Sequence, residues 1–493
     1  MSDRQKSLKM NFIMNVLLTV ASFIFPVVTF PYVSRVLGPD GTGKVAFATS
    51  VISYFAMFAQ LGIPTYGIRA CAKVRDDREQ LVRVIHEVLL INFLMSILVY
   101  IALGISLAVV PRLRQDKPLM IIISLTIVLN AMGAEWLYKA MEEYSYIAIR
   151  SIAFKAIALA AMFLLVREKQ DYVIYGGITI LASSASNILN FGRILRRGGL
   201  RPVGGYNPGR HIKAIMIFFA MSCATTIYTN LDTVMLGFMK SDEEVGYYSA
   251  AVKIRMLLTG VVTSLGTVLL PRASYYIEQG KKKEFLAISH KAIHFVLLMA
   301  FPLTLFFMLY AREGVMLLSG QKYLPAVLPM QVIMPTLLLI GMTNIMGIQM
   351  LIPLGGEKYV LYSEVAGAAA DLALNALLIP SMASTGAAIG TLAAETLVWM
   401  VQYFVLRAEY REIYAHIRYG LLAAAALAGT AAGYGVKLLG LAVFPTLLLG
   451  AVVFFGIYGG VLLAAGEALT IEIKEILLYK WKSNRRFTGH EEQ

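Results

Sequence analysis

The sequence predicts an all-α integral membrane protein with 14 transmembrane helices. The first observation is composition: 58% of the 493 residues are hydrophobic and only 15% are charged, whereas about 25% of the residues of a soluble domain are charged. The second is distribution, because the apolar residues form blocks of about 20, which is the length of a helix that crosses a bilayer. Backbone amides find no water inside a bilayer, so each block must form a helix.

The predicted spans follow one another with short polar loops between them. The first span begins after a basic segment and is too long for the apolar region of a signal peptide, so we expect it to remain uncleaved. The spans comprise approximately residues 10–33, 44–67, 84–110, 118–138, 147–166, 172–192, 212–238, 245–270, 290–310, 326–354, 359–380, 384–406, 417–438 and 443–467.

The basic residues predict the orientation of the spans. When loops are assigned to alternate sides, those on the N-terminal side carry 30 Lys and Arg residues and the others carry 11. Because Lys and Arg are enriched in cytoplasmic loops, we expect both termini in the cytoplasm. The net charge of +14 then reflects orientation and contact with anionic lipid headgroups, and does not require nucleic acid as a partner.

Several classes of function are disfavoured. The chain has no Gly-x-x-x-x-Gly-Lys-Ser/Thr loop, so it carries no ATPase site of that kind. Cys71 and Cys223 lie far apart without ligand spacing, and we expect both to be small apolar residues. Short outer loops provide no reaction chamber. We therefore expect a membrane transporter and not an enzyme, with no metal and no cofactor other than a coupling H⁺ or Na⁺.

An internal repeat indicates two lobes. "SRVLGPDGTGKVAFATSV" after the first span is similar to "DTVMLGFMKSDEEVGYYSAAVKI" after the seventh, and Gly43 corresponds to Gly246 at an offset of about 200 residues, or six spans. Parallel repeats place the substrate between them near the bilayer midplane. We predict an N-terminal lobe over 1–198, a cytoplasmic linker over 199–211, a C-terminal lobe over 212–407, and two further spans with a cytoplasmic tail over 408–493.

Two cations lie within the eighth span, where a charge is costly. Counted from the outer end of the span, Lys253 lies about 12 Å deep and Arg255 about 15 Å deep. Asp232 in the seventh span lies about 10 Å deep and can pair with only one of them. Residues two apart do not share a helix face. We therefore expect at least one of the two cations to face a water-filled cavity or an anionic ligand.

Other cations sit inside or at the ends of spans. Lys155, inside the fifth span, either lines the cavity or has a local structural role. Arg150, near the inner end of that span, is expected to extend to the membrane surface. Arg35 ends the first span on the outer side and Arg69 ends the second on the inner side, and each is an interfacial anchor or a cavity residue.

Acidic residues are also present in the spans. Glu364, Asp371 and Asn375 are seven and four residues apart, which places them on one stripe of the eleventh span. Either neighbouring helices satisfy these acids, or one acid binds H⁺ or Na⁺ and couples transport to an ion gradient. Both interpretations remain open for Asp371, whereas packing is favoured for Glu395 in the twelfth span. Glu135, at the inner end of the fourth span, is expected to be an interface residue.

Three stretches carry a family resemblance. "FPVVTFPYVSRVLGPDGTGKVAFATSVISYFAMFAQLGIPTYGIRACAKVRDD", residues 25–77, resembles the opening of the Wzx-type polysaccharide repeat-unit flippases, which handle O-antigen and exopolysaccharide units. That family belongs to the multidrug/oligosaccharidyl-lipid/polysaccharide exporter superfamily. "NLDTVMLG" before "VGYYSAAVKI", and "NALLIPSMASTGAAIGTLAAET", are similar to later helices of the superfamily. The resemblance extends from about residue 10 to about residue 406.

The resemblance implies a fold and a substrate. It implies two six-helix lobes around a V-shaped cavity of the MATE type, and an undecaprenyl-diphosphate-linked oligosaccharide that moves from the inner to the outer leaflet of a bacterial cytoplasmic membrane. Membrane lipid, a polysaccharide polymerase and a chain-length regulator are candidate partners. The candidate residues for the diphosphate cavity are Lys253, Arg255, Lys155, Arg35 and Arg69, and those for ion coupling or an ion pair are Asp232, Asp371 and Glu364.

Three alternatives remain open. A peptidoglycan lipid-precursor flippase of the same superfamily shares the chemistry, but its first helix differs from residues 25–77. A cation-coupled multidrug exporter is expected to have an acidic, aromatic cavity in place of Lys253 and Arg255. A membrane scaffold or polymerase subunit is expected to have a packed core, whereas a flippase requires a positive chamber.

Overall fold

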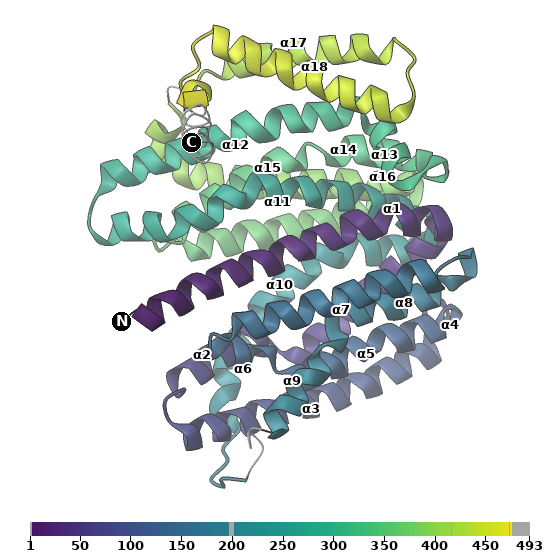
Figure 1. The fold of residues 1–493 in the computed structure, drawn as a ribbon, viewed down its shortest axis with the longest axis vertical. Coiled ribbons are helices and arrows are strands. Elements are labelled where there is room, and N and C mark those ends of the chain that lie inside the picture. The colour runs from purple at the N-terminus through teal and green to yellow at the C-terminus, as the bar shows by residue number, and fades with distance from the viewer. Residues whose placement is uncertain (1, 197–201, 416, 473, 476–493) are drawn as a thin grey trace, which may run out of the picture. The chain divides into compact units, whose positions relative to one another are not determined.

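The computed structural model describes residues 2–196, 202–415, 417–472 and 474–475. Within these ranges every regular element is a helix (Figure 1). The chain divides into two compact units, which are described separately. Unit 1 contains Met1–Ser249, Leu318–Tyr323 and Asn375–Ser384, and unit 2 contains Ala250–Leu317, Leu324–Leu374 and Thr385–Gln493. The lobe boundaries given above stay predictions.

The helices of both units follow the apolar blocks of the sequence. Those of unit 1 are α1 (Ser2–Gln60), α2 (Ile63–Lys73), α3 (Arg78–Val109), α4 (Pro111–Gln115), α5 (Lys117–Gly133), α6 (Glu135–Ala140), α7 (Tyr144–Leu165), α8 (Tyr172–Ile180), α9 (Asn187–Arg196) and α10 (Gly209–Met239). Helix α11 (Asp242–Glu278) begins in unit 1 and continues in unit 2. Unit 2 adds α12 (Lys282–Leu309), α13 (Ala311–Ser319), α14 (Val327–Ile333), α15 (Thr336–Thr343), α16 (Glu357–Tyr410), α17 (Tyr419–Lys437) and α18 (Val443–Ala464).

Helix α1 is bent where the sequence predicts a loop between two spans. Gly38 has a φ of 70° and interrupts the helix, and Pro39 follows it. Glycine adopts positive φ without steric cost, so the chain turns here. The two arms of α1 pack against α3, α5, α7 and α10, and Figure 1 shows α1 in purple beside α7 in blue. An apolar cluster that includes Val33, Leu37 and Met162 fills the contact with α7.

The repeated glycines of the sequence allow two helix ends to meet within unit 1. A Cβ atom at Gly43 in α1 would overlap the backbone of Asp242, and one at Gly246 in α11 would overlap the backbone of Pro39. Arg112 in α4 joins the same region, because its Nε donates to the Gly237 carbonyl at 2.7 Å and its Nη2 pairs with Asp242. The glycines therefore permit close backbone packing here, as small residues do between membrane helices.

Adding a methyl group at this contact is expected to destabilise the protein. Gly246→Ala must move backbone atoms and not only a side chain, so we expect a loss of about 1–3 kcal/mol in stability, seen as a lower melting temperature in detergent. The control is Gly456→Ala in α18, where a Cβ atom would meet nothing within 4 Å. A melting temperature unchanged by Gly246→Ala would contradict the close packing.

Helix α16 contains a second kink, again between two predicted spans. Ala383 has a φ of 47° and interrupts the helix, and the next backbone amide bonds to a side chain. That amide, of Ser384, donates to Glu244 Oε2 at 3.1 Å, and the Ser384 hydroxyl donates to the same oxygen at 2.5 Å. Glu244 thus holds the backbone at the kink, and both Glu244 and Ser384 belong to unit 1.

The last two helices form a pair within unit 2. Figure 1 shows α17 and α18, in yellow, side by side, and they are in extensive contact. Tyr310, after α12, anchors them: its hydroxyl donates to the Gly433 carbonyl at 2.7 Å, and its ring fills the space beside Gly450. An aromatic cluster of Phe306, Tyr310 and Phe454 surrounds this point.

The length and composition of the helices indicate a membrane. Nine helices in the described part of the chain are long and apolar enough to cross a bilayer, or up to eleven if each of two bent pairs is one span. Helix α5 is a shorter apolar helix of 17 residues. Large apolar side chains such as Leu164, Leu377 and Val452 are exposed on the helix surfaces. The chain is a multi-pass membrane protein.

Candidate functional site

The two predicted cavity cations lie on α11 in unit 2 and are both half-buried. The Arg255 Nη1 donates to the Thr336 Oγ1 at 3.4 Å. The hydroxyl of Thr336, at the start of α15, donates to the Ile333 carbonyl at 2.6 Å. Its oxygen can therefore accept the hydrogen bond from Arg255. The Arg255 Nε has no hydrogen-bond partner among the described residues. Arg255 is therefore positioned by α15, and its buried Nε has unused hydrogen-bonding capacity.

The three other predicted cations occupy different environments in unit 1. Lys155 in α7 is half-buried and its Nζ donates to the Ser22 Oγ of α1 at 2.7 Å. Arg35 is exposed and its Nη1 donates to the Pro31 carbonyl, one turn earlier, at 2.7 Å. Arg69 in α2 is exposed. Their roles in binding stay predictions.

Asp232 is buried in α10, with 8% of its surface exposed. Its Oδ1 accepts a hydrogen bond from the Asn375 Nδ2 of α16 at 2.6 Å, and its Oδ2 accepts one from the Tyr248 hydroxyl of α11. All three residues belong to unit 1. Asp232 thus joins three helices through its two hydrogen bonds.

The other acids of the spans differ in exposure. In unit 2, Asp371 lies one turn before Asn375 in α16 and is 2% exposed, whereas Glu364, on the same stripe, is exposed. Glu395, on the second arm of α16, is buried. A buried carboxylate needs polar partners or a cation, because hydrocarbon does not solvate it. Asp371 therefore has the burial that an ion-coupling residue requires, and Glu364 has not.

Arg150 does not extend to the membrane surface, so that expectation was wrong. It is 5% exposed, and its guanidinium donates to the Ser186 Oγ at 3.0 Å, the Asn187 Oδ1 at 2.8 Å and the Glu135 Oε2 at 3.1 Å. Polar side chains of the sixth predicted span thus hold the guanidinium inside unit 1. Glu135 is its counterion.

A buried polar cluster in unit 1 was missed by the sequence analysis. Glu87 in α3, only 1% exposed, accepts hydrogen bonds from the Asn207 backbone amide at 2.7 Å, from Arg210 at 2.6 Å and from His211 at 2.6 Å. The other ring nitrogen of His211 lies in a short hydrogen bond with the Tyr66 hydroxyl. The carboxylate thereby fixes the described end of the linker, and the start of α10, to α3.

Removing the charge of Glu87 is expected to release this segment. Breaking a buried pair by changing one partner typically costs about 3–5 kcal/mol, so Glu87→Gln should expose the chain around Arg210 to trypsin. The control is Glu142→Gln, which removes the half-exposed carboxylate that pairs with Arg75 at 3.0 Å. Equal rates of tryptic cleavage after Arg210 in both variants would contradict the anchoring role.

The described residues also line pockets within each unit. In unit 2, Trp399, Tyr403, Tyr414 and Tyr419 line an apolar pocket of about 530 Å³ together with leucines of α12 and α15. The rings of Trp399 and Tyr403 are stacked, with their centroids 5.4 Å apart. No group of three or more His, Cys, Asp or Glu side chains that could hold a metal ion occurs among the residues that the structure describes.

Comparison with known proteins identifies the family. The model of the family described as "Polysaccharide biosynthesis protein" matches residues 8–277, more than half of the chain. The chain belongs to this family. A second model, MatE, matches residues 218–355. The resemblance of residues 25–77 to polysaccharide repeat-unit flippases is confirmed at the level of the family.

Two curated relatives match this chain along most of its length and nearly all of their own. The protein named "Putative O-antigen transporter" of Escherichia coli K12 is 24% identical over 409 residues, which cover 83% of this chain and 98% of that protein. A protein of the same name from Shigella dysenteriae is 26% identical over 415 residues, which cover 81% and 100%. The relatives are thus named as transporters, and no enzyme is among these two.

Two solved structures share the fold. The lipid II flippase MurJ in an inward closed conformation superposes with a TM-score of 0.70 at 14% identity, over 95% of this chain and 99% of that one. A multidrug resistance transporter of the MATE family, in an inward-facing conformation, gives 0.61 at 14% identity, over 81% and 95%. These likenesses establish a MurJ- and MATE-like helical fold.

Proposed function

We propose that this family member is a flippase for undecaprenyl-diphosphate-linked oligosaccharide repeat units. It moves them from the inner to the outer leaflet of the bacterial cytoplasmic membrane by alternating access, and so serves surface polysaccharide biosynthesis. Two observations carry the proposal. The family model matches residues 8–277, and the two relatives named putative O-antigen transporters match this chain over at least 98% of their own length. A polysaccharide polymerase and a chain-length regulator are the proposed downstream partners.

The proposed topology has 14 spans with both termini in the cytoplasm. Support comes from the kinks at Gly38 and Ala383, because each divides one long helix into two arms of membrane-spanning length. To reach 14 spans, each of the two bent helix pairs is counted as one span, and α5 is counted as a short span. The excess of Lys and Arg on the side of the N-terminus supports the orientation.

The proposed diphosphate site consists of Lys253 and Arg255, with Lys155, Arg35 and Arg69 contributing to the cationic cavity. A lipid diphosphate is anionic at neutral pH, and guanidinium and ammonium groups bind phosphate through charge-assisted hydrogen bonds. Arg255 supports this assignment, because its contact with Thr336 is long and its Nε has no hydrogen-bond partner among the described residues. The sugars need only hydration and a few donors, and the polyprenyl tail stays in lipid.

The proposed coupling residues are Asp232 and Asp371, which would bind H⁺ or Na⁺ when an ion gradient drives transport. Burial supports both, because a buried carboxylate that gains or loses a cation changes its interaction with its neighbours by several kcal/mol. Glu364 was a third candidate, and its exposure makes it the weakest of the three.

Two related functions differ from the proposed one in the substrate that is transported. A peptidoglycan lipid-precursor flippase and a multidrug exporter share the fold, but the relatives that match by sequence carry neither name. Reconstitution of the purified protein into vesicles with a fluorescent undecaprenyl-diphosphate oligosaccharide in one leaflet tests the proposal. We expect transfer to the other leaflet above the rate of protein-free vesicles. Transfer of lipid II alone, or efflux of a cationic dye alone, would overturn it.

A further inference from the structure

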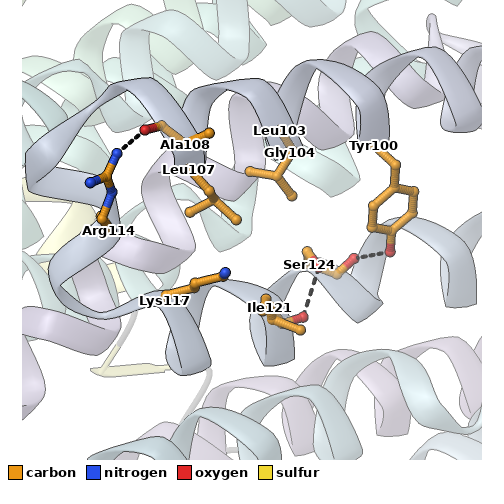
Figure 2. Close-up of a pocket in the computed structure, with 9 residues that line it drawn as sticks. All are labelled: Tyr100, Leu103, Gly104, Leu107, Ala108, Arg114, Lys117, Ile121 and Ser124. Carbon is orange, nitrogen blue, oxygen red and sulfur yellow. Dashed lines mark hydrogen bonds between the residues drawn. The ribbon is translucent and has the colours of Figure 1, made fainter.

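A groove of about 460 Å³ lies between α3 and α5 in unit 1. Its walls are mainly apolar, and two basic residues stand at one end (Figure 2). The residues that line it are Tyr100, Leu103, Gly104, Leu107, Ala108, Arg114, Lys117, Ile121 and Ser124. No acidic side chain is among them.

The apolar part of the groove is closed at the end away from the cations. The Tyr100 hydroxyl donates to the Ser124 carbonyl at 2.7 Å and joins α3 to α5 there, as Figure 2 shows. Midway along the groove, a Cβ atom at Gly104 would meet nothing within 4 Å. Glycine at this position therefore keeps a space open and does not serve helix contact. From Tyr100 to Leu107 the slot extends about 10 Å along α3.

The two cations at the other end are exposed and are not neutralised within the protein. Arg114 uses one Nη2–H on the Ala108 carbonyl, and among the described residues neither Arg114 nor Lys117 takes part in an ion pair. The neighbouring charges are engaged elsewhere, because Arg112 pairs with Asp242 and Asp116 accepts the Tyr172 hydroxyl at 2.9 Å. Both cations thus have donors available for an anion.

The surroundings of the groove are those of a lipid-facing surface. Along α3, Ile101, Ile105 and Val109 are more than half exposed, and Ile121 of α5 is exposed beside the groove. Arg114 lies in the short helix α4 and Lys117 begins α5, so both stand between two apolar helices, where Lys and Arg typically meet lipid headgroups. The groove therefore offers an apolar slot below the interface and positive charge at the interface.

We propose that this groove binds one anionic phospholipid. Its phosphate lies between Arg114 and Lys117, and one acyl chain lies along Leu103, Leu107 and Ile121. The match is one of charge and length, because two single cations suit one phosphate and the slot ends after part of an acyl chain. The site is separate from the proposed transport residues and does not depend on the flippase activity. In the proposed orientation it binds a lipid of the outer leaflet.

Native mass spectrometry of the purified full chain in detergent tests the site. Phosphatidylglycerol and phosphatidylcholine with the same acyl chains are titrated separately. We expect the wild type to bind phosphatidylglycerol on the order of tenfold more tightly, and Arg114→Ala with Lys117→Ala to remove that preference. Gly104→Leu fills the slot and is expected to weaken binding of both lipids. Arg167→Ala with Lys169→Ala removes the same charge from exposed positions outside the groove and should leave the preference intact.

Three results would overturn the proposal. They are equal binding of the two lipids by the wild type, an unchanged preference in the Arg114 and Lys117 double variant, and displacement of phosphatidylglycerol by undecaprenyl monophosphate at equal concentration. The last would assign the groove to the carrier lipid. Because lipid binding is measured without transport, the first two results leave the proposed flippase function untouched.

Discussion

Lys253→Ala and Arg255→Ala are each expected to abolish surface polysaccharide while the protein remains at its normal abundance in the membrane. In the proposed site, each substitution removes one charged donor to the lipid diphosphate, and losing a charge-assisted hydrogen bond typically costs about 1.5–3 kcal/mol. That cost corresponds to at least a tenfold loss of transport at about 1.4 kcal/mol per factor of ten. The measurements are polysaccharide on the cell surface and immunoblots of the membrane fraction.

The controls separate charge from structure. Lys253→Arg and Arg255→Lys keep the charge and should retain part of the polysaccharide. Arg272→Ala removes an exposed cation from the same helix, α11, and should have no effect. Normal polysaccharide in both alanine variants and in the double variant would remove the two residues from the site.

Asp371→Asn is expected to weaken transport that depends on an ion gradient. The substitution keeps the size of the side chain and removes the charge that would hold H⁺ or Na⁺. Flipping in vesicles, measured with and without a proton or sodium gradient, should lose its response to the gradient while a slow gradient-independent rate remains. Asp232→Asn should have the same effect, because Asp232 is also buried and its carboxylate accepts hydrogen bonds from Asn375 and Tyr248.

Two comparisons define how Asp371→Asn is interpreted. Glu364→Gln changes an exposed acid of the same helix and should leave the response to the gradient unchanged. If Asp371→Asn flips at the wild-type rate with and without each gradient, Asp371 is a packing residue.

The helices were predictable from the sequence because the membrane requires them. The predicted spans 290–310 and 443–467 correspond to α12 (Lys282–Leu309) and α18 (Val443–Ala464). Helix α12 begins earlier than predicted because its first turns are polar and lie outside the apolar block. The glycine repeat also marked a real structural feature, since Gly43 and Gly246 both pack against backbone.

The polar contacts were less predictable, because they join residues far apart in the chain. Arg150 has a long side chain near a span end and therefore resembles a surface anchor, but Asn187 and Glu135 hold it inside. Glu87 and His211 are 124 residues apart, and neither stands in a motif. One sign was available, since Glu87 lies within an apolar block, where a carboxylate must have a partner.

If this family member transports a lipid-linked oligosaccharide, as we propose, depletion of the protein must leave that lipid unprocessed in the cell. Lipids extracted from depleted cells are analysed by mass spectrometry. We expect accumulation of undecaprenyl diphosphate carrying a complete oligosaccharide repeat unit, with the peptidoglycan precursor at its normal level. Unchanged amounts of the lipid-linked oligosaccharide, or accumulation of the peptidoglycan precursor in its place, would show that the protein does not transport this lipid.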